Sequence, residues 1–160
     1  MKKAVLLVAL CIMTMVTGYA QDTSKVKGRV DDIVKRYENT NGVDCMTAVK
    51  GEGLGLLKMM LNQQFGRDFM KGVTSITIIN YSDADPETCI ALRKELDQFC
   101  SLLEEFRADD DEEFAENDYV RIFALPLEEG AISDFVIAIE DKESKMMMHM
   151  AGKIKFDNVD

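Results

Sequence analysis

Apolar residues recur at helical spacing in two early stretches of the chain. In the first, from Thr23 or Ser24 to about Glu38, they stand three or four residues apart, and Asn41-Gly42 follows as a stop signal. The second stretch, Leu56–Phe65, is rich in Met and Leu and follows a glycine-rich break. The spacing therefore predicts one helix over each stretch.

A third helix is predicted after Asp85, which can cap it. Pro86 suits a first helical turn, and Glu87 favours the positive end of the helix dipole. Its apolar positions form one continuous stripe, made of Cys89, Leu92, Leu96, Phe99, Leu103 and Phe106. A stripe of this kind is typical of a helix packed on a sheet.

Alternation with a period of two predicts the strands. Val43–Val49 and Thr74–Tyr81 are short runs between turn signals, and the second is rich in β-branched residues. Three further strands are predicted at Tyr119–Leu127, Ala131–Glu140 and Lys145–Phe156. The turns Glu128-Glu129-Gly130 and Asp141-Lys142-Glu143 connect them, so they form an antiparallel meander.

The order of these elements predicts the fold class. Helix-strand-helix-strand-helix followed by three strands is an α+β domain with a mixed sheet of about five strands. No repeat or long linker divides residues 21–160. This length fits one domain with a hydrophobic core of its own.

Residues 1–20 have the layout of a secretory signal peptide. Two lysines precede an uncharged apolar run, and small residues stand where a signal peptidase reads. We expect cleavage between Ala20 and Gln21, a periplasmic or secreted product, and no transmembrane segment in the mature chain. Cys11 comes early and follows a bulky leucine, which argues against a lipid anchor.

The chain is strongly acidic. It has 19 basic and 29 acidic residues, a formal charge of −10. Loss of Lys2 and Lys3 with the signal peptide leaves 17 basic residues against 29, or −12. Such a field repels nucleic acid and anionic lipid head groups, so we exclude nucleic acid as a partner.

Three cysteines follow the signal peptide: Cys45, Cys89 and Cys100. Cys89 and Cys100 share a face of the third predicted helix but stand about 16 Å apart along its axis, too far for a disulfide. The other pairings stay open. No Cys-x-x-Cys motif is present, and we interpret the thiols as small buried hydrophobes.

The order of elements and several short motifs resemble the DUF4252 family of small exported proteins, found mainly in Bacteroidetes. The resembling segments are Tyr37–Val43, Thr74–Tyr81, Gly130–Val136 and Gly152-Lys153-Ile154. The resemblance extends over about residues 23–156 and implies the fold order and an exported location. Many members look like lipoproteins, from which this chain departs. No activity, cofactor or catalytic residue comes with the resemblance.

The last predicted strand is a candidate copper site. Thioether sulfurs and an imidazole are soft ligands that hold Cu(I). Alternation, however, points Met146, Met148 and Met150 to one face and Met147 and His149 to the other. Packing by adaptable methionines is therefore the favoured interpretation, and we expect no cofactor.

The acidic stretch before the meander is a candidate calcium site, with Asp109, Asp111 and Glu113 as possible ligands. As an EF-hand loop it fails, because Phe114 stands at the glycine position and Val120 where a bidentate Glu is needed. A solvated loop is the favoured interpretation. A metal-binding envelope protein stays an alternative function.

No motif indicates an enzyme. His149 is the only histidine, and no nucleophile elbow is present. The glycines at 51, 53 and 55 do not have the spacing of a dinucleotide-binding loop. We therefore expect no catalytic residues, with a hydrolase lacking a recognisable motif as the less favoured alternative.

The strand Ala131–Glu140 is apolar on both faces, which is unusual in a meander with helices on one side. Either the first helix covers the second face, or that face is an interface for a protein partner or a second copy. We take Ile132, Val136, Met147 and His149 as the candidate binding surface. The expected function is thus a non-catalytic binding module of the cell envelope.

Overall fold

The computed structural model describes residues 23–65, 67–106 and 119–155. The elements in chain order are α2 (Thr23–Tyr37), β1 (Asp44–Ala48), α3 (Glu52–Phe65), α4 (Arg67–Lys71), β2 (Val73–Asn80), α5 (Pro86–Cys100), β3 (Glu104–Phe106), β4 (Tyr119–Pro126), η1 (Glu128–Gly130), β5 (Ala131–Glu140), β6 (Lys145–Gly152) and β7 (Ile154–Lys155). The proposed signal peptide with Cys11, Ala20 and Gln21 lies outside the described residues, as do the acidic residues Asp109, Asp111 and Glu113.

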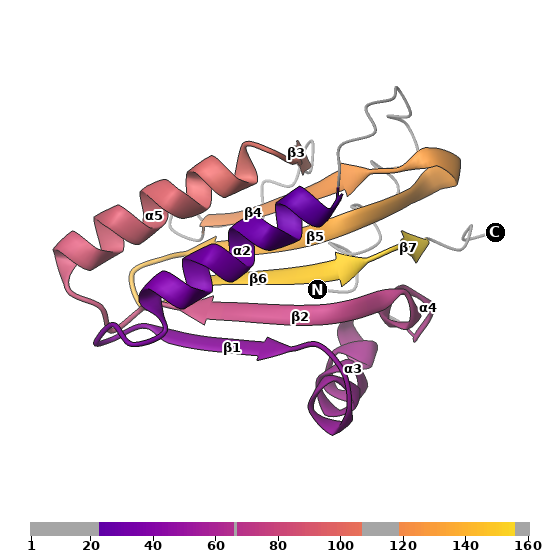
Figure 1. The fold of residues 1–160 in the computed structure, drawn as a ribbon, viewed down its shortest axis with the longest axis horizontal. Helices are drawn as coiled ribbons and strands as arrows, with labels where there is room; N and C mark the ends of the chain where they lie inside the picture. The colour runs from indigo at the N-terminus through magenta and orange to yellow at the C-terminus, as the bar shows by residue number, and fades with distance from the viewer. Residues whose placement is uncertain (1–22, 66, 107–118, 156–160) are drawn as a thin grey trace.

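The strands form one sheet of seven in the order β1-β2-β6-β5-β4-β3, with β7 paired to β5 (Figure 1). Every pairing between described strands is antiparallel, including the meander of β4, β5 and β6. The α+β class is confirmed. The mixed sheet of five strands is corrected, because β2 joins the meander antiparallel and β3 and β7 are additional strands.

Helices cover the two faces of the sheet differently. The long helices α2 and α5 lie across one face, whereas α3 and α4 lie at the end of the sheet near β1, β2 and β7 (Figure 1). Under α2 and α5, Val30 and Leu92 share a core cluster with Ile79, Val136 and Met147. Ile76 and Met150 point to the other face of the sheet. There they pack with Leu54 of α3 and with Phe69 and Met70 of α4.

A bulge in β5 interrupts the simple alternation of faces. Asp134 has a φ of 51°, and the β4–β5 register shifts between Phe123 and Leu125. The extra residue reverses the face of the sheet to which the preceding side chains point, so Ile132 packs in the same cluster as Phe135. The expectation that Ile132 shares a face with Val136 is therefore wrong.

Two of the predicted helices differ from the structure at one end. Helix α3 begins at Glu52, so Gly53 and Gly55 lie inside it and the glycine-rich segment does not break it. Helix α5 ends at Cys100, and residues 104–106 pair with β4 as the edge strand β3 instead of continuing the helix. The predicted cap is confirmed, since Asp85 Oδ1 accepts hydrogen bonds from the backbone N–H groups of Glu87 and Thr88.

Among the residues that the structure describes, no helix is both long and apolar enough to cross a membrane.

Candidate functional site

The candidate binding surface predicted from the sequence is buried. Ile132 and Val136 are 0% exposed, and Met147 and His149 are 1% exposed. Val136 and Met147 pack beneath α2 and α5 in one cluster. The interface hypothesis for these four residues is therefore wrong, and the alternative that the first helix covers this face is confirmed, with α5 sharing the role.

The same face holds a buried acid–base pair. His149 Nε2 lies 2.9 Å from Asp134 Oδ1, and because a carboxylate can only accept, the ring N–H donates. Ser133 Oγ donates to the other carboxylate oxygen, Oδ2, at 3.0 Å. The side chains of His149 and Asp134 are 1% and 2% exposed, so the pair is shielded from water.

Neighbouring elements fix the position of the imidazole. In the sheet register, His149 stands between Thr77 of β2 and Val136 of β5. The ring of Phe99, from α5, meets the imidazole edge to face at a centroid distance of 5.7 Å. Strand pairing on both sides and an aromatic ring from the helix layer thus leave His149 no access to the surface.

This geometry does not match a nucleophilic triad. In such a triad the histidine stands between the hydroxyl and the carboxylate, so that it can take the hydroxyl proton. Here Asp134 stands between Ser133 and His149, and the hydroxyl already donates to the carboxylate. The arrangement instead satisfies buried polar groups, and its role is to hold β5 and β6 together at the bulge.

The sequence contains a pattern that indicates this pair, although the sequence analysis did not identify it. Asp134 is an acidic residue inside an otherwise apolar strand, and the only histidine of the chain lies in the next strand. A buried carboxylate needs a donor, and the antiparallel pairing of β5 with β6 brings these two residues together. Pairing acids and bases across the predicted meander would have found it.

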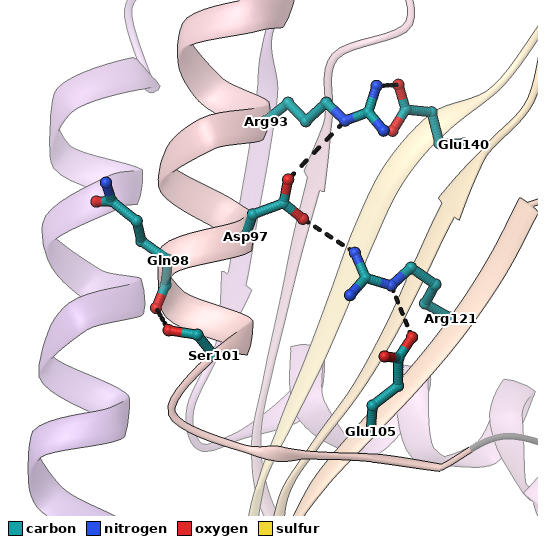
Figure 2. A network of polar contacts seen from close by, with 7 residues as sticks. All are labelled: Arg93, Asp97, Gln98, Ser101, Glu105, Arg121 and Glu140. Carbon is teal, nitrogen blue, oxygen red and sulfur yellow. Dashed lines mark hydrogen bonds and ion pairs between the residues drawn. The ribbon is translucent and has the colours of Figure 1, made fainter.

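A second polar cluster joins α5 to the edge of the sheet (Figure 2). Arg121 of β4 donates from Nη1 to Asp97 Oδ1 at 3.0 Å and from Nε to Glu105 Oε1 at 2.8 Å. Arg93 Nη1 lies 3.1 Å from Glu140 Oε1. Each of these three carboxylates is matched to a guanidinium, so the cluster ties α5 to β3, β4 and β5.

The pKa values of two of the three described thiols are raised. All three described cysteines are free. Burial raises the pKa of the Cys100 thiol to about 12 and, with the nearby Glu38 and Asp44 carboxylates, also raises the pKa of Cys45. Cys89 Sγ lies within hydrogen-bonding distance of the carbonyl oxygens of Tyr81 and Ala84, at 3.6 and 3.4 Å. The thiolate is the reactive form, so raised pKa values do not support a nucleophilic role for Cys45 or Cys100.

The candidate calcium ligands Asp109, Asp111 and Glu113 lie outside the described residues, so only the candidate copper site can be compared with the structure. No group of three or more His, Cys, Asp or Glu side chains comes together among the described residues. Met148 and Met150 pack in the cluster under α3 and α4, whereas Met147 packs under α2 and α5. The sequence interpretation that alternation separates the methionines is confirmed, and it divides the candidate copper ligands between two layers.

The most exposed apolar cluster of the described chain lies on α3. Leu56 is 56% exposed, and Met59 and Met60 are each 63% exposed. These residues recur three and four positions apart, so they share one side of the helix, which we call the α3 surface. Val49, just before the helix, is 43% exposed. The sequence analysis predicted this helix but did not identify its outer side as a site.

Comparisons with protein-family models, with curated proteins and with solved structures found no match to this chain. The resemblance to the DUF4252 family stays a prediction.

Proposed function

We propose that this chain is an exported, non-catalytic binding module that associates through the α3 surface. The observation that carries the proposal is the clustering of Leu56, Met59 and Met60, all more than half exposed, on one side of a single helix. Contiguous exposed apolar area costs free energy in water and usually marks a site of association.

Folding alone does not account for these side chains. The opposite side of α3 already attaches the helix to the protein through Leu54, Leu57, Leu61 and Phe65, which belong to or pack against the core cluster of this face. An amphipathic surface helix normally carries polar residues on its outer side. Here that side carries leucine and methionine, and methionine adapts well to varied partners.

The location is part of the proposal. The charge and hydropathy pattern of residues 1–20 supports export to the periplasm or beyond, and the resemblance to an exported family points the same way. Of the free thiols, Cys100 is buried and Cys89 lies within hydrogen-bonding distance of two carbonyl oxygens, which is compatible with an oxidising compartment.

The test compares binding of three proteins to the envelope fraction of the producing cells by co-sedimentation. Each is expressed with its own N-terminal segment, so all carry the same N-terminus. Burying two methionine side chains contributes about 1.5–3 kcal/mol each, so a Met59→Gln/Met60→Gln variant should lose at least about tenfold in affinity. Ile90→Gln, at a 71% exposed residue of α5, is the matched control and should bind like the wild type. Equal binding by all three proteins would contradict the proposal.

A further inference from the structure

The charge of the chain is unevenly distributed. Although the whole chain carries −10, residues 49–72 and 152–155 contain six basic residues and only the two acids Glu52 and Asp68. The basic residues are Lys50, Lys58, Arg67, Lys71, Lys153 and Lys155. Lys50 directly precedes α3, and Arg67 and Lys71 belong to α4, which directly follows it.

The fold brings the two basic segments together. Helix α4 contacts β7, and the backbone of Gly72 lies against the backbone of Lys153. In Figure 1, α3, α4 and β7 all lie at the end of the sheet where β1 and β6 finish. The α3 surface is therefore part of a locally positive end of an acidic protein.

These six cations have no carboxylate partner among the described residues. None of them makes an ion pair with another residue that the structure describes, whereas Arg36, Arg93 and Arg121 elsewhere in the molecule are all paired to carboxylates. Basic residues at the same end of the fold as exposed leucine and methionine form a combination found in helices that lie at membrane interfaces.

We propose that the α3 surface docks on an anionic lipid bilayer, with Leu56, Met59 and Met60 entering the interface and the surrounding lysines and arginine contacting the head groups. This inference rests on the proposed function, because it names the partner of the same surface. Electrostatic attraction near an anionic surface and apolar insertion act together in such binding. The net charge of the whole chain repels anionic head groups, as the sequence analysis expects, so the attraction is local to this end; the negative remainder of the molecule orients that end toward the membrane.

A second copy of the chain fits this surface less well. In a twofold dimer the same patch meets itself, so the basic residues around one α3 surface would face those around the other. Like charges brought together in this way oppose association. An anionic surface has the complementary sign.

The experiment measures co-sedimentation with vesicles of phosphatidylcholine alone or mixed equally with phosphatidylglycerol, again with each protein carrying its own N-terminus. We expect binding to the mixed vesicles that weakens strongly from about 0.1 M to about 1 M salt, where the Debye length falls from ~10 to ~3 Å. Met59→Gln/Met60→Gln and Lys50→Glu/Lys71→Glu should each lower the partition coefficient about tenfold. Ile90→Gln and Lys142→Glu, both at exposed residues remote from α3 along the chain, are the controls and should change nothing.

The lipid inference is overturned by no vesicle binding, by equal binding to both kinds of vesicle, or by equal losses of binding in the control variants. If vesicle binding is absent but envelope binding still depends on Met59 and Met60, the proposed function stands and the partner is a protein. Self-association without vesicles that is abolished by Met59→Gln/Met60→Gln would overturn the lipid inference in favour of a dimer. If neither vesicle binding nor envelope binding depends on Met59 and Met60, the proposed function is wrong as well.

Discussion

Replacement of His149 by leucine is the most severe single change that the structure predicts. Leucine fills a similar volume but removes the donor to Asp134 Oδ1. The carboxylate, 2% exposed, would keep only the hydroxyl of Ser133 as a partner. The variant therefore leaves a buried polar oxygen, Asp134 Oδ1, without its hydrogen-bond partner.

The expected cost follows from this burial. Leaving a buried hydrogen-bonding group without its partner costs about 1–3 kcal/mol, a large part of the 5–15 kcal/mol that stabilises a typical domain. Asp134→Asn should cost about 1–2 kcal/mol, because asparagine tolerates the positive φ of 51° and retains an acceptor without the charge. The two residues share one hydrogen bond, so the loss in the double variant should be smaller than the sum of the two single losses.

The assay is urea unfolding, followed by far-ultraviolet circular dichroism. It compares the wild type, His149→Leu, Asp134→Asn and the double variant. Thr77→Val is the control for burial without charge: Thr77 is 3% exposed and neighbours His149 in the register, and its hydroxyl pairs with Thr47 Oγ1 at 3.3 Å. It should cost about 1 kcal/mol. A His149→Leu loss no larger than that of Thr77→Val, or strictly additive losses in the double variant, would refute the assignment of a stabilising buried pair.

Four further predictions concern other parts of the fold. Asp85→Ala should lower the thermal midpoint by a few degrees, because the carboxylate caps two backbone N–H groups of α5; Asp85→Asn should lower it less. Above pH 9 the unfolded Cys100 thiol ionises while the folded one, with its pKa raised to about 12 by burial, stays neutral. The free energy of unfolding should therefore fall with rising pH, by about 1.4 kcal/mol per pH unit for this group. Denaturation measured at several pH values should show a shallower fall for Cys100→Ala than for the wild type. Gly152→Ala should destabilise the protein in the same urea assay, because φ is 133° and the added Cβ would collide with the Gly72 carbonyl oxygen. Gly53→Ala in α3 meets open space and should instead stabilise by up to about 1 kcal/mol.

Local signals along the chain were enough to predict most of the elements. The cap at Asp85, the three- and four-residue spacing of α2 and α5, and the turns of the meander each act over a few residues, and the structure contains all of them. Burial of the second face of the meander under α2 was among the open alternatives, because an apolar face needs a cover.

What could not be predicted depends on contacts distant in sequence. The bulge at Asp134 inverts the facing of Ile132, and nothing in the spacing of apolar residues reveals an extra residue in one strand. Phe106 fits the helical stripe of α5 equally well, but pairing with β4 draws it into an edge strand. The glycines of α3 suggest a break on propensity alone, and packing of Leu54 on the sheet outweighs that preference.

The sequence analysis placed the candidate binding surface on buried residues for the same reason. His149 and Val136 have a composition that fits either an interface or a core, and the choice depends on where α2 and α5 lie. The outer side of α3 was visible in the sequence as Leu56, Met59 and Met60 at helical spacing. It was not recognised because a second apolar side of the same helix, with Leu57 and Leu61, also had to be buried.

Methionine footprinting tests the central claim, that the α3 surface is the binding surface, most directly. Met59 and Met60 are each 63% exposed, whereas Met147 and Met150 are 1% and 0% exposed and serve as internal controls. Oxidation to the sulfoxide is followed by mass spectrometry with and without the envelope fraction. The account predicts that Met59 and Met60 oxidise fast in the free protein and become protected on binding, while Met147 and Met150 stay slow throughout. Unchanged oxidation of Met59 and Met60 when the protein is fully bound would contradict it.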